Sequence, residues 1–191
     1  MRKIILVILV AFAGTCPVLA YPDKDFYSSD EINDGDYWSN VNIYGNDTVV
    51  DMFGGWVGNL TTHNQSIFNV YGGSVDFLLT SSDSSFINID DSIDIGTITV
   101  EEFGTVDIHS GSINALSATG GSINLYAYDI TYDPTGGSFG EGELTGRYYK
   151  NDNFFAYDLH EGVYPYITVI PEPATFLLVG LGGLLLRKKR K

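Results

Sequence analysis

Apolar and polar residues alternate along most of the chain, in short phrases of four or five residues. One series of such phrases lies at residues 41–44, 68–71, 87–90, 106–109 and 123–126. A second series, in which each phrase opens with Gly-Ser or Gly-Thr, lies at residues 73–77, 96–100 and 111–115. Alternation with a period of two residues predicts β-strands with one buried face. Because no helical periodicity interrupts the phrases between residues 40 and 130, we expect an all-β protein.

The phrases resemble one another and recur every 17 to 27 residues, with two strands in each repeat. Repeats of this length predict the coils of a solenoid, because one coil alone cannot bury its apolar face. We therefore expect a short β-solenoid, similar to a parallel β-helix, over residues 40–132. Its outward Asn and Asp residues either pair in ladders or face water. The alternative is an antiparallel β-sandwich, which short strands between frequent turns also indicate.

The segments on either side of the repeats lack the phrase. Residues 21–39 are acidic, and we expect them to form an N-terminal cap or the strand by which the chain enters the solenoid. The sequence Asp133-Pro134 ends the repeats, and the segments 143–146, 154–157 and 167–170 that follow are expected to be three longer strands. We therefore expect residues 133–170 to form a C-terminal β cap that packs on the last coil.

The first 20 residues have the three parts of a secretory signal peptide. Arg2 and Lys3 supply the positive charge, residues 4–14 are apolar, and small residues precede a cleavage site between Ala20 and Tyr21. Cys16 raises the alternative of a lipoprotein, although the Thr before it fits that signal poorly. Cleavage after Ala20 removes the only cysteine, so the exported protein would contain no disulfide.

The C-terminus carries a second transport signal in three parts. Pro171-Glu172-Pro173 precedes an apolar stretch at residues 174–186, and five cationic residues close the chain, namely Arg187, Lys188, Lys189, Arg190 and Lys191. Thirteen residues form a helix of about 20 Å, which is short for a hydrocarbon layer of ~30 Å. The basic residues can reach the cytoplasmic interface and make up the missing length. We therefore predict a transmembrane helix at residues 174–186.

This arrangement resembles the PEP-CTERM sorting domain of bacterial exosortase substrates, and the resemblance covers residues 171–191. It implies export, a transient tether in the inner membrane, and cleavage by an exosortase near Pro171-Glu172-Pro173, after signal peptidase has acted at the other end. It also implies release to the cell surface or the extracellular matrix of bacteria that make exopolysaccharide. Glu172 would then be part of the recognised motif and not a catalytic residue.

The cations gather at the two ends of the chain. The net charge of the whole chain is −14, but residues 21–170 contain three cations and 23 acidic residues, a net charge of −20. A body this acidic repels phosphate, which argues against binding to nucleic acid. Hydrophobic residues make up 44% of the chain and aromatic residues 14%, so the body is expected to fold.

No motif in the body predicts catalysis. Residues 136–140 match the G-x-S-x-G pattern of a nucleophile elbow, but they lack the strand before and the helix after that the elbow needs. His63, His109 and His160 have no metal-ligand spacing. We therefore expect no enzymatic activity. A small carbohydrate-active β-helix enzyme remains the alternative, and it would require two carboxyl groups that converge in a groove.

Two kinds of residue are candidates for binding. Weak calcium candidates are Asp83, Asp90, Asp91 and Asp94, with a second acidic group at Asp30, Asp34 and Asp36. Neither group has the spacing of an EF-hand, and a solvated acidic surface explains both equally well. Tyr71, Tyr126 and Tyr128 are candidates for a strip that stacks on sugar rings, or for ordinary strand residues. We expect a structural passenger, with polysaccharide or calcium binding as the alternative.

Overall fold

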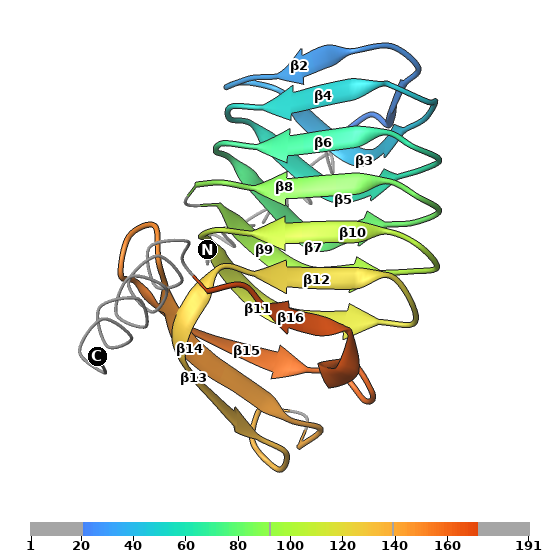
Figure 1. The fold of residues 1–191 in the computed structure, drawn as a ribbon. Helices are drawn as coiled ribbons and strands as arrows, with labels where there is room; N and C mark the ends of the chain where they lie inside the picture. Colours follow the sequence, from blue (N-terminus) through green and yellow to red (C-terminus); the bar gives the residue numbers. More distant parts are fainter. Residues whose placement is uncertain (1–20, 92, 139, 172–191) are drawn as a thin grey trace, which may run out of the picture.

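The structure is a computed structural model, and it describes residues 21–91, 93–138 and 140–171. The chain winds into about five coils, and each coil contributes one strand to each of two sheets (Figure 1). Neighbouring coils pair in parallel throughout the stack. The predicted β-solenoid is confirmed, and the alternative of an antiparallel sandwich is wrong for the repeats.

Sheet B is the more regular of the two sheets. Its strands in spatial order are β2 (Asp30–Ile32), β4 (Val49–Met52), β6 (Ile67–Val70), β8 (Phe86–Ile89), β10 (Thr105–Ile108), β12 (Ser122–Leu125) and β16 (Ile167–Val169). From β4 to β12 each strand has four residues and buries the second and the fourth. The alternation in the sequence predicts this pattern directly.

Sheet A has longer and less regular strands. Their spatial order is β1 (Lys24–Phe26), β3 (Tyr37–Ile43), β5 (Trp56–Thr62), β7 (Ser74–Ser81), β9 (Asp94–Val100), β11 (Ser112–Ala118), β15 (Phe154–Leu159), β14 (Glu143–Tyr148) and β13 (Ala127–Asp133). The register shifts by one residue between β5 and β7, and again between β7 and β9. Both shifts place the extra residue on β7, which therefore bulges at Asp76 and Phe77.

The inward residues of both sheets form one continuous hydrophobic core. Phe68, Ile87 and Leu79 are each 0% exposed, and their counterparts in the coils above and below are buried in the same way. This core has no disulfide to support it in the described residues. Stacked coils therefore supply the apolar contacts that a single coil cannot make.

The repeat is shorter and more uniform than the sequence suggested. Paired residues in neighbouring coils lie 17 to 20 positions apart, as for Val50 and Phe68. The expected spacing of 27 residues was wrong, because the phrase at 41–44 belongs to β3 in sheet A and the phrase at 68–71 to β6 in sheet B. The true counterpart of 68–71 is 50–53. Strands of the two sheets share one alternation, so sequence similarity alone did not separate them.

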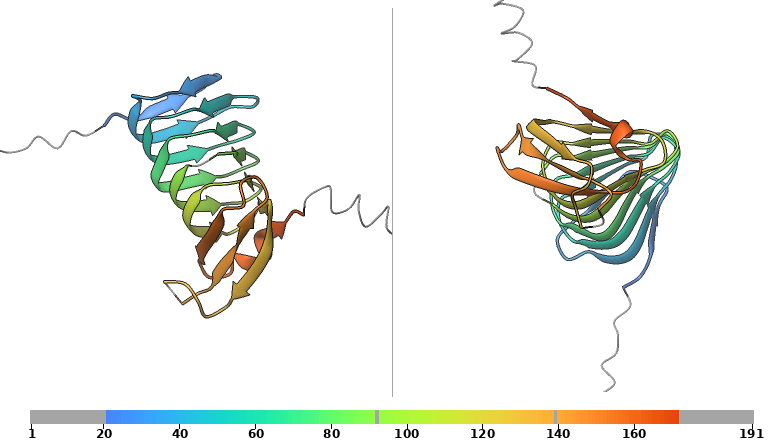
Figure 2. Two further views of the ribbon diagram at one scale, coloured as in Figure 1. Left: turned by 90° about the vertical axis from the view of Figure 1, so that its left-hand side faces the viewer. Right: turned by 90° about the horizontal axis from the view of Figure 1, so that it is seen from below.

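The two ends of the stack differ (Figure 2). Residues 21–39, where we expected a cap or an entering strand, contain β1, β2 and the start of β3, and they continue both sheets. The Nζ of Lys24 lies 5.0 Å from the centre of the Phe26 ring and 5.7 Å from that of Trp38, at the edge of the core. This inward-facing cation protects an edge strand from pairing with another chain.

At the other end β13, β14 and β15 form an antiparallel sheet that extends sheet A. β15 also pairs in parallel with β11, and β16 pairs with β12 after a short 3₁₀ turn, η1 (Tyr164–Tyr166). The buried Tyr148 donates a hydrogen bond to the carbonyl oxygen of Gly111 (3.0 Å), and its hydroxyl also bonds that of Tyr157. These contacts fasten the antiparallel sheet to the last coils.

Several expectations fall on residues that the structure does not describe. The signal peptide with Cys16, and the sorting segment from Glu172 onward with its apolar stretch and basic tail, lie outside the described residues. Within the described part of the chain, no helix is long and apolar enough to cross a membrane.

Candidate functional site

Polar residues on the outer face of sheet B pair with one another along the stack. Asn69 donates from its side-chain nitrogen to Asp51 Oδ1 at 2.8 Å, and Asn124 donates to Asp107 Oδ1 at 2.7 Å. Each of these bonds joins neighbouring coils, and all four residues are partly buried. Hydrogen bonds to charged groups contribute more than neutral ones, so these ladders stabilise the stack and occupy its outward carboxylates.

A column of rings follows the C-terminal ends of the sheet B strands. Phe53 stacks on Tyr71 with ring centres 5.2 Å apart, and His109 stacks on Tyr126 at 3.9 Å. Asp90 occupies the position between these two pairs, since its backbone nitrogen bonds to β6 and that of His109 to β8. Tyr71 and Tyr126, two candidates for a sugar-binding strip, therefore lie in one column. Each has one ring face covered by its stacked neighbour, so only the other face could meet a sugar.

An ion pair and two partly buried rings stabilise this column. The Nζ of Lys150 lies 3.1 Å from Asp90 Oδ1, which links the antiparallel sheet to the fourth strand of sheet B. Burial lowers the pKa of His109, against the raising effect of Asp90 and Asp107, so the ring is neutral at pH 7. Burial raises the pKa of Tyr126, which also donates a hydrogen bond to Asp107. The third tyrosine candidate, Tyr128, lies away from this column and stacks on Tyr149.

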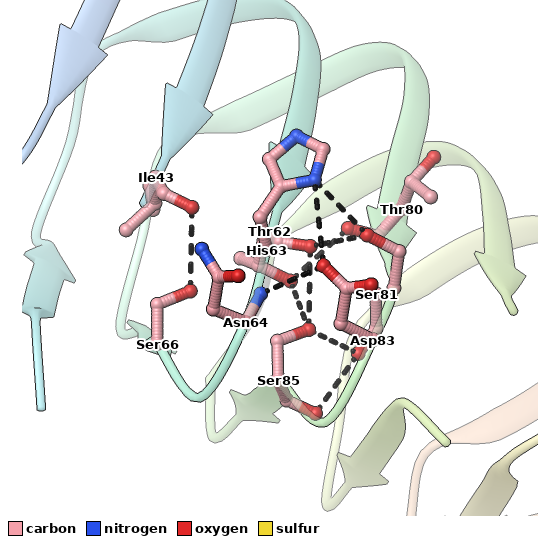
Figure 3. A network of polar contacts seen from close by, with 10 residues as sticks. Ile43, Thr62, His63, Asn64, Ser66, Thr80, Ser81, Asp83 and Ser85 are labelled. Carbon is pink, nitrogen blue, oxygen red and sulfur yellow. Dashed lines mark hydrogen bonds and ion pairs between the residues drawn. The ribbon is translucent and has the colours of Figure 1, made fainter. Parts of the chain in front are cut away.

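Buried hydroxyl groups fill the opposite corner of the coils (Figure 3). Ser85 Oγ lies 2.7 Å from Thr62 Oγ1 and 2.9 Å from Ser81 Oγ. Ser82 Oγ donates to the carbonyl oxygen of Thr62 at 2.8 Å. Small hydroxyl side chains satisfy each other where the backbone turns, which lets polar residues sit inside the core.

The same corner brings together a serine, a histidine and an aspartate that the sequence had not paired. Ser82 Oγ lies 3.2 Å from His63 Nδ1, and Asp83 Oδ2 lies 4.0 Å from that same nitrogen. A catalytic triad needs the serine on one ring nitrogen and the carboxylate on the other. Here both contact Nδ1, so the arrangement does not relay a proton. His63 also stacks on Tyr44 with centres 4.6 Å apart, which continues the corner as a structural column.

The weak calcium candidates do not gather. Asp83 follows β7 and accepts a hydrogen bond from the Asn64 backbone, Asp90 and Asp91 follow β8, and Asp94 begins β9. Among residues 21–91, 93–138 and 140–171, no group of three or more His, Cys, Asp or Glu side chains is placed to hold a metal ion. The acidic residues at 30, 34 and 36 are included in that finding.

A groove on the outer face of sheet A is the site that best fits a ligand. It consists of two hollows, of about 550 Å³ and 210 Å³, which share Asp94, Ser112 and Asn114. The smaller hollow lies beside the bulge of β7 and is also lined by Asp76. The larger lies where β15 separates from β11, and is also lined by Phe154.

The pairing of the strands explains both hollows. β15 pairs with β14 from Phe154 to Asp158, but it is in register with β11 only at Ala115 and Leu116, so the two strands are not paired before that point. The register places Gly96 between the bulge of β7 and Asn114 of β11. A Cβ at Gly96 would lie 2.3 Å from the carbonyl oxygen of Asp76, so glycine is required there. The missing side chain leaves the smaller hollow open.

Two carboxylates, Asp76 and Asp94, line this groove, as the enzyme alternative required. Both are exposed, and neither makes a hydrogen bond or ion pair within the described residues. A carboxylic acid that acts as a general acid near neutral pH usually owes this to burial in an apolar pocket. The groove is open, and both carboxylates in it are exposed to solvent. Sequence reasoning missed the groove because Asp76 and Asn114 come from different coils.

The G-x-S-x-G segment lies elsewhere. It falls in the turn between the antiparallel strands β13 and β14, and the backbone nitrogen of Ser138 donates to Asp158 Oδ1 at 3.1 Å. No helix follows it in the described residues, so the geometry of a nucleophile elbow is absent. His160 lies 3.8 Å from Glu141 through its Nδ1.

Comparison with known proteins identifies the C-terminus. Residues 169–191 match the model of the PEP-CTERM protein-sorting motif. The match covers the Pro-Glu-Pro sequence, the apolar stretch and the basic tail. Neither the curated proteins nor the solved structures contain a match to the chain.

Proposed function

We propose that the β-solenoid of this chain is a structural, non-catalytic passenger, carried to the cell exterior by the PEP-CTERM sorting motif at residues 169–191, which implies an exported, membrane-anchored precursor that an exosortase processes. The passenger resides at the cell surface or in the extracellular matrix, in contact with exopolysaccharide. Signal peptidase removes residues 1–20 before the exosortase acts, and the inner membrane holds the precursor only in transit.

One observation carries this proposal. Asn side chains of the repeats form hydrogen bonds with Asp residues one coil away, as Asn69 does with Asp51, and aromatic rings stack on rings one coil away, as Tyr71 does on Phe53. Side chains that bond to neighbouring coils lend rigidity to an elongated body. A net charge of −20 keeps such a body soluble outside the cell.

The sorting step is tested by intact mass in cells that have a functional exosortase. We expect the exported protein to begin at Tyr21 and to lack the residues that follow the Pro171 region. The variant Glu172→Ala should keep its full C-terminus and accumulate in the membrane fraction. Glu161→Ala, which changes an exposed glutamate outside the motif, is the matched control and should be processed normally. A full C-terminus on the natural protein at the cell exterior would contradict the proposal.

The absence of catalysis needs a separate measurement. Processed protein is incubated with the matrix polysaccharide of its host, and newly formed reducing ends are counted. We expect no more ends than with heat-denatured protein. Release of ends that disappears in Asp94→Asn would replace the passenger role with that of a carbohydrate-active enzyme that uses the groove.

A further inference from the structure

We propose that the groove on sheet A binds an oligosaccharide that carries no anionic groups. The site lies between the bulge of β7 and the first residues of β15. This proposal rests on the proposed function in one respect only, namely that the exported protein lies at the cell surface or in the matrix, where such a glycan is present. The argument rests on the aromatic rings, the polar lining and the dimensions of the groove.

One exposed phenylalanine lines the groove, and a second is the chain neighbour of a residue that lines it. Phe77 follows Asp76 on the bulge and is 64% exposed, and Phe154 lines the larger hollow and is 63% exposed. Neither has an aromatic partner among the described residues. The exposed rings of Phe53 and Tyr71, by contrast, stack on each other. The ring of Phe154 in the groove and the ring of Phe77 beside it thus offer open faces.

Open aromatic faces point to sugar rings as partners. An aromatic face carries partial negative charge, and the C–H groups on one side of a pyranose present partial positive charge and an apolar surface. The bulge explains why Phe77 is turned outward: the extra residue leaves Asp76, Phe77 and Leu78 exposed in succession on β7. A regular strand would have turned one of the three inward.

The polar lining suits hydroxyl groups. Asn114 and Asn153 supply amide donors and acceptors, Ser112 a hydroxyl, and Asp76 and Asp94 carboxylate acceptors. The side chains of these carboxylates have no partner within the described residues, so they are available to a ligand. Among the described residues, no Lys or Arg lines either hollow. An anionic glycan would meet two uncompensated carboxylates, whereas a neutral or amine-bearing one meets acceptors.

The groove is long enough for several sugar units. It crosses β7, β9, β11 and β15, which at the usual strand spacing is about 14 Å. A peptide strand is the competing occupant, because the edge of β11 that faces β15 is unpaired before Ala115. That edge comprises three residues, and β-augmentation generally uses a longer run of backbone hydrogen bonds. The open phenyl rings therefore favour the glycan.

Processed, exported protein is screened on an array of neutral, amine-bearing and anionic glycans, each with and without a calcium chelator. We expect binding to a non-anionic glycan, tighter for a hexasaccharide than for its disaccharide and unchanged by the chelator. Calorimetry then follows variants with that hexasaccharide. Phe77→Ala and Phe154→Ala should each weaken binding about three- to tenfold.

Phe103→Ala is the matched control, because Phe103 is 78% exposed, has no ring partner in the described part of the chain and lies outside the groove. It should leave affinity unchanged. The groove proposal is overturned if no non-anionic glycan binds, if anionic glycans bind better, or if the double variant Phe77→Ala/Phe154→Ala binds as tightly as the natural protein. Capture of a β-strand peptide by the groove with no glycan bound also overturns it.

The same samples separate this proposal from the passenger role. If the bound hexasaccharide is shortened during calorimetry, the groove binds glycan but the protein is not a non-catalytic passenger. If no glycan binds and the protein is still correctly processed, the passenger role stands without the groove.

Discussion

The two sheets of this solenoid are built from the same coils, but their outer surfaces differ. In sheet B, strands of four residues repeat without a bulge, and outward residues such as Asn69 and Asp51 bond across coils. In sheet A, strands such as β5 and β7 have seven or eight residues, and β7 bulges at Asp76 and Phe77. The sheet ends in an antiparallel extension. Sheet A also has bonds between coils near its N-terminal end, such as that from Asn42 to Asp25 Oδ1 at 2.9 Å. Around its bulge and its extension, however, it holds the open carboxylates of Asp76 and Asp94 and the exposed ring of Phe154.

The difference indicates where a repeat protein can place function. A perfect repeat sets each side chain beside its counterpart, so identical or complementary residues satisfy each other. Where the repeat is interrupted, a side chain has no equivalent residue beside it and stays available to a ligand. The groove forms at two interruptions, the register shift of β7 and the separation of β15 from β11. Three predictions, in order of decreasing effect, test how far the two sheets differ.

The same substitution in the two sheets should have opposite consequences. Phe68 of β6 is 0% exposed and packs between coils, so Phe68→Ala should lower the free energy of unfolding by ~3–5 kcal/mol. Phe77→Ala removes an exposed ring and should change it by less than about 0.5 kcal/mol. Chemical denaturation followed by circular dichroism measures both. A large loss of stability in Phe77→Ala would show that the Phe77 ring supports the fold. The ring would then not be free to bind a ligand.

Alkaline pH should weaken the extension of sheet A. Burial raises the pKa of Tyr148 from 10.0 to about 12 and raises that of Tyr157 in the same direction. Because the folded pKa is the higher one, this contribution is complete below pH 10 and is lost as pH rises to about 12. A two-unit shift corresponds to ~3 kcal/mol.

Hydrogen exchange at rising pH measures this effect segment by segment, after correction for intrinsic exchange rates. Protection of β14 and β15 should fall before that of β6 and β8. Tyr148→Phe retains the ring and cannot ionise at that position, so its stability should depend less on pH in this range. Equal loss of protection in both sheets would mean that the extension and the solenoid unfold as one unit.

The regular part of the fold could be predicted from the sequence, and its assembly only in part. The alternation of phrases such as Phe68-Asn69-Val70 specifies buried and exposed faces, which led to parallel coils. The same alternation occurs in both sheets, so it did not show that residues 41–44 pair with 60–63 and not with 68–71. Which strands pair depends on the length of the turns between them, and the phrases themselves do not indicate that length.

The groove could not be predicted, because it depends on what the repeat omits. Gly96 is one of many glycines, and only the register shows that it faces Asp76 on one side and Asn114 on the other. The tyrosine candidates had the right chemistry for sugar stacking, but Tyr71 and Tyr126 each have one face covered by a stacked neighbour. Residue type indicates what a ring can bind, whereas the coil above it determines whether a face is open.

The smallest effect compares two aspartates. Asp107 accepts hydrogen bonds from the Asn124 side chain at 2.7 Å and from the Tyr126 hydroxyl at 3.2 Å. Asp107→Ala should therefore lower the free energy of unfolding by ~1–3 kcal/mol, since it leaves both donors without their acceptor. Asp76→Ala removes an exposed carboxylate that has no bonded partner in the described residues, and should change stability by less than about 0.5 kcal/mol. Equal losses for the two variants, in parallel denaturation curves, would mean that Asp76 stabilises the fold as much as the ladder of sheet B does. Asp76 could then not serve the groove as a free acceptor.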